Sequence, residues 1–194
     1  MKIKIYSVLL LLILAAPFSL SQNFESGTFG SPVFKYTSIL KQNSLIIGGR
    51  FGWVINKSFV LGGGFYGLTG SVRTNYIDKK SGQNVRMGFN FGGLELEYIS
   101  FSGKPVHVSI DMLFAGGGLY FSVADKSVPH NSYFSQDLLV WEPSINLEIN
   151  TLSWLKTDLN FSYRMITSFK GSYGITKEDL TGPAVGIAFK LGSF

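Results

Sequence analysis

Eleven ionisable side chains fall in the polar phase of segments that alternate apolar and polar residues, and they are the first candidates for chemistry. Within Trp141–Asn150, for example, Glu142 and Glu148 share that phase. Residues of one phase lie on one face of a β-strand, so these charges are predicted to gather inside a closed sheet. Buried charges need partners of opposite sign, because an unpaired charge is costly to bury. The predicted lumen charge network comprises Arg50, Glu95, Glu97, His107, Asp111, Glu142, Glu148, Lys156, Asp158, Arg164 and Lys190.

These charges have two interpretations. In one, they form salt bridges that fill and close the interior; in the other, they form a path for protons or small solutes. The interior of an eight-stranded barrel is just wide enough for side chains to fill it, which favours the first interpretation. The sequence therefore predicts a closed lumen, with a narrow channel as the alternative.

Catalysis would most simply use a histidine, and the chain has two. His107 and Asp111 would share a strand face but lie four residues apart, roughly 13 Å by strand rise, which is too far for a direct hydrogen bond. His130 stands alone in the polar segment 128–132. Two histidines without any cysteine also disfavour a transition-metal site. We therefore predict no catalytic, cofactor or metal site. A lipid-modifying enzyme would need His130 at the outer rim.

Eight alternating segments are predicted as the strands that position these charges. The connections between them alternate between short turns and long polar loops. An even number of strands connected in this way is typical of bacterial barrels. The fold class is therefore all-β, an eight-stranded antiparallel up-and-down transmembrane β-barrel. The predicted strands are 33–40, 44–55, 58–72, 85–101, 105–122, 138–150, 154–168 and 182–193.

The composition of the two phases indicates which face is inside. The polar phase is rich in small residues, such as Gly48 and Gly52 beside Arg50, which suit a crowded barrel interior better than a soluble surface. The opposite phase carries large apolar side chains that lipid would solvate, which disfavours a lipocalin-like soluble barrel. Aromatic residues near the strand ends are predicted to lie at the lipid–water interfaces. They include Trp53, Tyr98, Trp141 and Trp154.

The segment 85–101 departs from this rule. Phe89 and Phe91 share a phase with Glu95 and Glu97, although lipid-facing and lumen-facing residues should alternate. We predict a β-bulge at 92–93 that switches the phase, because an extra residue in one strand has that effect.

The first 21 residues have the pattern of a cleaved secretory signal peptide. Lys2 and Lys4 precede an apolar run that is too short to span a membrane, and Ser19-Leu20-Ser21 forms a small-x-small cleavage site. Residues 22–32 are predicted as a short periplasmic lead-in and 33–194 as the barrel. The net charge of +5 includes both signal lysines, and the remainder is too weakly basic to indicate nucleic-acid binding.

The signal peptide, the eight alternating strands and Phe194 resemble the small outer-membrane barrels of the OmpA/OmpX type. The segments 48–53 and 93–98 also resemble uncharacterised barrels of the same class. The resemblance implies the outer membrane of a Gram-negative bacterium, with outer-membrane lipid and the assembly machinery as partners. It also implies that Phe194 is an assembly signal, although Phe189 and Leu191 hold the lipid-facing phase. Projecting strands of the OmpX type imply adhesion or defence.

We predict a non-enzymatic barrel with a structural or interaction role through its external loops. Basic residues of these loops could pair with lipopolysaccharide phosphates or simply keep the loops soluble. A narrow channel or a transport or secretion component is the alternative, followed by a lipid-modifying enzyme. The basic loop residues are Arg73, Lys79, Lys80, Arg86, Lys126, Lys170 and Lys177.

Overall fold

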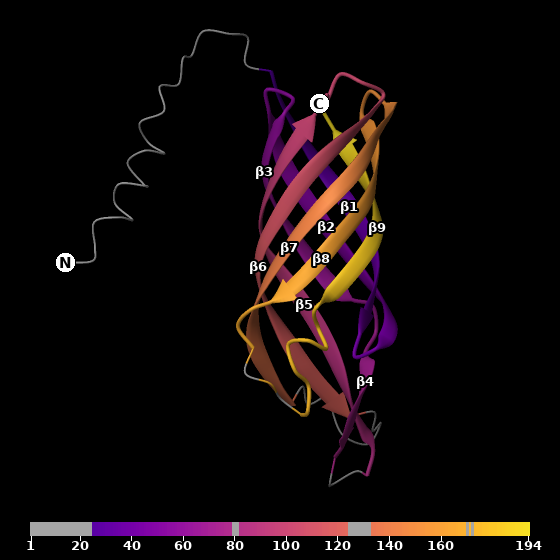
Figure 1. Cartoon of the computed structure of the whole chain (residues 1–194), viewed down its shortest axis with the longest axis vertical. Helices are drawn as coiled ribbons and strands as arrows, with labels where there is room; N and C mark the ends of the chain where they lie inside the picture. Colours follow the sequence, from indigo (N-terminus) through magenta and orange to yellow (C-terminus); the bar gives the residue numbers. More distant parts are fainter. Residues whose placement is uncertain (1–24, 79–81, 124–132, 170, 172) are drawn as a thin grey trace, which may run out of the picture.

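A single antiparallel sheet that closes on itself makes up the computed structural model, which describes residues 25–78, 82–123, 133–169, 171 and 173–194. The alternating segments form the strands, and neighbouring strands pair in the order β3-β2-β1-β9-β8-β7-β6-β5-β4. β3 also pairs with β5, which closes the wall (Figure 1). The strands are β1 (Ser26–Ile39), β2 (Gln42–Ile55), β3 (Phe59–Leu68), β4 (Val72–Ile77), β5 (Asn84–Ser100), β6 (Val106–Val123), β7 (Tyr133–Leu152), β8 (Leu155–Ile166) and β9 (Gly182–Gly192).

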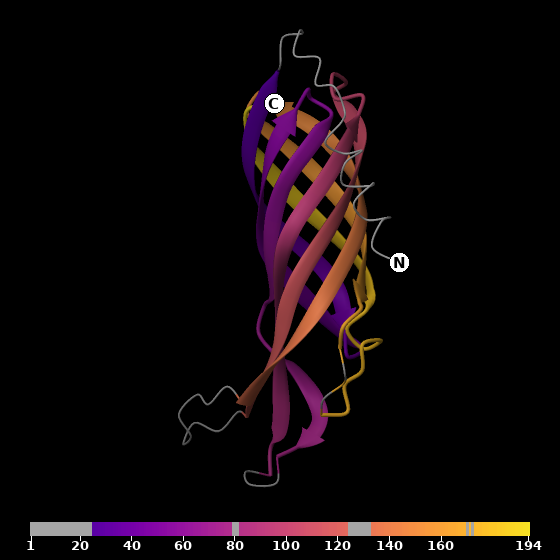
Figure 2. The ribbon, with the colours of Figure 1, turned by 90° about the vertical axis from the view of Figure 1, so that its left-hand side faces the viewer.

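Eight of these strands form the barrel wall, as predicted. The additional strand, β4, pairs only with β5. It arises because the predicted strand 58–72 is interrupted at Gly70, whose φ of +84° is incompatible with a continuous strand. Beyond this break the chain continues as a hairpin that projects past the rim (Figure 2). The fold class is confirmed as an all-β, eight-stranded antiparallel transmembrane barrel.

Tight turns close the hairpins at both ends of the barrel. Leu40 and Lys41 connect β1 to β2 with positive φ values of 52° and 59°. Two such residues in succession are typical of the type I′ turn, whose twist matches that of the flanking strands. The β2–β3, β5–β6 and β7–β8 connections are also short, and they lie at the rim where the chain ends (Figure 1). In bacterial barrels short turns face the periplasm, so we name this rim periplasmic on that expectation and call the rim from which the hairpin projects the outer rim.

The first strand is longer than predicted. β1 begins at Ser26 rather than at residue 33, so it includes residues that we had assigned to the lead-in. Pro32 lies within it, opposite Gly49 of β2. The β1–β9 register is the same on both sides of Pro32, at Gly30↔Leu191 and at Val33↔Ala188. A proline has no N–H to donate, so it removes one hydrogen bond from the sheet without changing the register. The predicted signal peptide lies outside the described residues.

The predicted bulge at Gly92-Gly93 is wrong. β5 pairs with β3 and with β6 in unbroken register through these glycines. Phe89 and Glu97 therefore point to the same, inner side, and both are buried. The prediction failed because it assumed that a large apolar side chain must face lipid. The lumen itself changes from apolar to charged along this strand.

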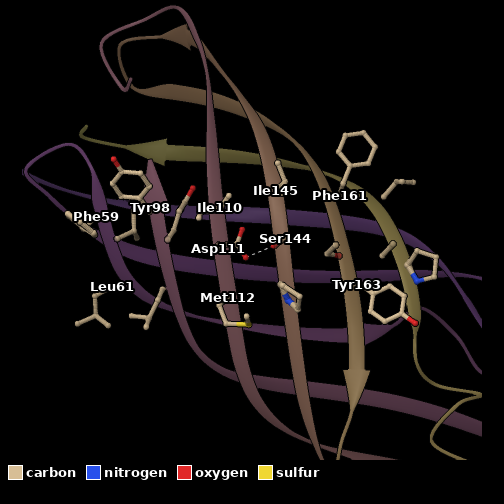
Figure 3. Close-up of a pocket in the computed structure, with 18 of the residues that line it drawn as sticks. Phe59, Leu61, Tyr98, Ile110, Asp111, Met112, Ser144, Ile145, Phe161 and Tyr163 are labelled. Atoms are coloured by element: carbon tan, nitrogen blue, oxygen red, sulfur yellow. Dashed lines mark hydrogen bonds between the residues drawn. The ribbon is translucent and has the colours of Figure 1, made fainter. Parts of the chain in front are cut away.

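Large apolar side chains cover the outside of the wall. Phe51, Phe65 and Leu94 are each more than 60 % exposed, as a lipid-facing surface requires. Figure 3 shows the alternation on β6 and β7: Ile110 and Ile145 belong to the outer face, whereas Asp111 and Ser144 are hydrogen-bonded on the inner face.

Among the described residues, no helix is long and apolar enough to cross a membrane.

Candidate functional site in the barrel lumen

All eleven ionisable residues of the predicted network lie inside the barrel. None is more than 8 % exposed. Lys35 of β1, which was not among the predicted residues, is also buried and faces the lumen. Its signal was present, since it shares the inward phase with Ser31 and Thr37. Within the predicted strand 33–40 that phase also carries Val33 and Ile39, so it did not read as a polar phase.

Lys190 of β9 lies at the centre of the charged region. Its Nζ is 2.8 Å from Oε1 of Glu97 and 3.2 Å from Oδ2 of Asp158, and it also donates to Glu148. The ligand atoms of these three carboxylates lie within 4.8 Å of one another, a spacing that could hold a metal ion. Here the ammonium group of Lys190 takes the position of the cation.

Arg50 and Lys156 bind the same group of acids from other sides. Nη2 of Arg50 is 2.8 Å from Oε2 of Glu97 and 3.1 Å from Oε1 of Glu95. Nζ of Lys156 lies 2.8 Å from Oε1 of Glu148. The carboxylates are thus shared between cations on three strands, and most of these contacts cross the lumen.

His107 completes this cluster through both ring nitrogens. Nε2 is 2.6 Å from Oε1 of Glu148, and Nδ1 is 3.0 Å from the carbonyl oxygen of Lys104. Glu148 also accepts from two lysines, so both neighbours of the ring are acceptors. Beside this histidine, the buried side chains of the described residues include five lysines and arginines and six carboxylates.

A second cluster lies around Glu142. This carboxylate accepts from Lys35 and, at 3.0 Å, from the Ser162 hydroxyl. Arg164 instead donates from Nε to the carbonyl oxygen of Leu180 at 2.9 Å. Among the described residues Arg164 has no carboxylate within ion-pair distance. The network predicted as one unit is therefore divided.

Asp111 binds neutral donors, not a cation. It accepts from Nδ2 of Asn146 at 2.7 Å and from the Ser144 hydroxyl. Asn146 is in turn linked to Asn160, whose amide donates to its side-chain oxygen at 2.6 Å. These amides and hydroxyls extend the charged region with hydrogen bonds.

Apolar layers lie on both sides of the charged region. Along β5 the inward residues run from Met87, Phe89 and Phe91 through the two glutamates to Ile99. The first group belongs to a large buried cluster towards the outer rim, which includes Ile175 and Leu180 of the β8–β9 loop. Ile99 belongs to a small cluster at the periplasmic rim with Phe29, Val54 and Val60.

Phe194 packs against this small periplasmic cluster. Its ring centroid is 6.1 Å from that of Phe29, and Nζ of Lys156 lies 4.3 Å from the centre of the Phe194 ring. The side chain of the predicted assembly signal is thus turned into the mouth of the barrel in the folded protein. Whether it is recognised during assembly stays a prediction.

The four predicted interface aromatics all lie on the outside of the wall, exposed by between 45 % and 54 %. Their contact with the membrane interfaces stays a prediction. His130, the residue on which the enzyme alternative depends, lies outside the described residues.

Comparison with known proteins shows which solved structures have a similar fold. No protein-family model matches the sequence, and no curated protein matches it. Among solved structures, the chain is similar to the N-terminal β-barrel domain of Pseudomonas aeruginosa OprF, with a TM-score of 0.57 and 11 % identity over 88 % of this chain and 99 % of that one. It is also similar to Neisserial surface protein A, with a TM-score of 0.53 and 8 % identity over 88 % of this chain and 97 % of that one. At such identities the likeness concerns the fold.

Proposed function

We propose that this chain is a non-enzymatic outer-membrane protein of a Gram-negative bacterium that acts through its external part while its lumen stays closed. The observation that carries the proposal is the layered interior. An apolar layer at each rim encloses a charged layer held by buried ion pairs. A water-filled path would have to cross both apolar layers, and each of them is packed with large side chains.

The external part has features of an interaction surface. β4 has no strand partner on its outer edge among the described residues, and residues 133–138 of β7 extend past the β8 register, which begins at Val140↔Ile166. Together β4, β5, β6 and the start of β7 form a projecting sheet with two open edges (Figure 2). Open edges present unpaired backbone groups that can bind another chain.

The inner side of this projecting sheet is covered by the β8–β9 loop. The ring of Tyr173 lies 4.8 Å from that of Tyr76 and 4.7 Å from that of Phe121. The loop thereby packs against the inner side of the sheet, and its Ile175 and Leu180 belong to the buried cluster below. The outer side and the edges stay available for partners, with outer-membrane lipid around the wall below them.

Single-channel recording tests the closed lumen. We expect the refolded barrel, checked by its shifted mobility on unheated gels, to give no discrete conductance steps in a planar bilayer. A water-filled porin recorded in the same membranes shows that insertion can be detected. Discrete steps that change in Arg50→Gln would overturn the closed lumen and make transport the primary function.

A further inference from the structure

Two arginines face each other on the outer side of the projecting sheet. Arg73 of β4 and Arg86 of β5 are directly opposite in the register. Like charges at such cross-strand positions repel and destabilise the pair, because their side chains emerge only about 5 Å apart. Within the described part of the chain, the Arg86 guanidinium donates from Nη1 to the Ser71 hydroxyl at 3.4 Å. Among the described residues neither guanidinium has a carboxylate within ion-pair distance.

The lumen contains a similar pair of like charges on neighbouring strands, but there an acid compensates them. Lys156 and Lys190 are also directly opposite in the β8–β9 register. There Glu148 lies between them and contacts both ammonium groups. The arginine pair outside lacks such an acid among the described residues. A bound anion would take the place that Glu148 has in the lumen, and paired guanidinium groups match the geometry of phosphate.

The wall below the arginine pair is unusually flat. The Tyr120 ring lies across Gly88, where a Cβ atom would be only 2.0 Å from Cε2 of the ring. The next outward positions are Asn90 and Gly118, which are also opposite each other in the register. An aromatic ring, an amide and bare backbone side by side offer both apolar contact and hydrogen bonds to a sugar.

The height of this face above the lipid-facing wall indicates which part of an outer-membrane lipid molecule could reach it. Phe114 packs edge-on against Trp141 on the outer wall, and beyond it the outward residues of β6 are Gly116, Gly118 and Tyr120. Arg86 pairs with Ser122, eight residues past Phe114. This is roughly 26 Å along the strand, and less in height because barrel strands are tilted. With Trp141 taken as the outer interface, as predicted, the arginine pair lies above the hydrocarbon, at the level of sugars.

We propose that this face, made of Arg73, Arg86, Ser71, Tyr120 and Asn90, binds a phosphorylated sugar of the lipopolysaccharide core. The two arginines hold the phosphate, and Tyr120 and Asn90 contact the sugar. The proposal rests on the proposed function, which places the projecting sheet outside the cell.

A binding experiment in lipid nanodiscs tests this assignment. The probe is lipopolysaccharide with a phosphorylated core, and the comparison probe is the same material after its core phosphates have been removed. We expect Arg73→Gln/Arg86→Gln to bind the phosphorylated form at least about tenfold more weakly than the unmodified chain, because two charge-assisted contacts are lost. The difference should vanish with the dephosphorylated form. A matched control is Lys57→Gln/Lys104→Gln, which removes two exposed charges at the periplasmic turns and should bind like the unmodified chain.

Three outcomes would overturn the assignment. Equal binding of both probes would exclude the core phosphate, and equal loss in both double variants would show only a general charge effect. Competition by inorganic phosphate at the same concentration as lipopolysaccharide would identify a free phosphate site instead. None of these outcomes bears on the closed lumen, since conductance is measured without lipopolysaccharide.

Discussion

The two halves of the lumen are built on the same strands but by different means. Phe89 and Phe91 of β5 stack on each other within the large buried cluster, and the Arg164 guanidinium lies over the Phe89 ring. Glu95 and Glu97 of the same strand are instead held by cations from β2 and β9. The apolar half depends on volume and shape, which several side chains could satisfy. The charged half depends on particular partners, because losing one of them leaves a buried charge uncompensated. The charged half should therefore be the less tolerant of substitution.

The largest effect is expected from Lys190→Met. The substitution keeps much of the side-chain volume but leaves three buried carboxylates without their shared cation, so it should lower the free energy of unfolding by about 3–5 kcal/mol. Urea unfolding in phospholipid vesicles, followed by tryptophan fluorescence, measures it. A loss below about 1 kcal/mol would show that the ammonium contributes little and would remove the distinction between the halves.

A smaller effect is expected from Phe89→Ala in the apolar half. The ring is fully buried, and its removal should cost about 3 kcal/mol through the cavity that it leaves. Phe89→Leu, which retains much of the volume, should cost about 1 kcal/mol in the same unfolding assay. If Phe89→Leu lowered the free energy of unfolding as much as Phe89→Ala, the stability of the apolar half would depend on side-chain shape rather than on buried volume. The apolar half would then tolerate substitution no better than the charged half.

The smallest effect is expected from Lys57→Met at the periplasmic turn. Lys57 forms an ion pair with Glu25, but both side chains are more than half exposed. Water and salt screen such a pair, so its loss should change stability by less than about 1 kcal/mol. Measured beside Lys190→Met, it separates the effect of burial from that of a lost lysine charge. A change as large as that of Lys190→Met would contradict the argument from burial.

The strand pattern could be predicted from the sequence because it is local. Alternation within β6, β7 and β8 shows which residues share a face, and turn residues mark where the chain reverses. The strand predictions were wrong where a side chain's position depended on more than its neighbours in the sequence. Pro32 lies inside β1 without shifting its register, although prolines usually mark the end of a strand, and the inward phenylalanines of β5 required knowledge of what lay opposite them.

By itself, the sequence determined that the chain forms a closed sheet and, except for Phe89 and Phe91 of β5, which of the residues in its alternating segments face the interior, because strand periodicity depends only on neighbouring residues. It did not determine which charges would meet. The register places Lys156 opposite Lys190 and Glu97 opposite Asp111, so these direct strand neighbours carry like charges, whereas His107 lies opposite Glu148. Only closure of the barrel brings Lys190 across the lumen to Glu97, 93 residues earlier in the chain. The tertiary structure decides the pairing of Lys190 with Glu97 and of Arg50 with Glu97 because these partners lie on strands that are not adjacent in the sheet.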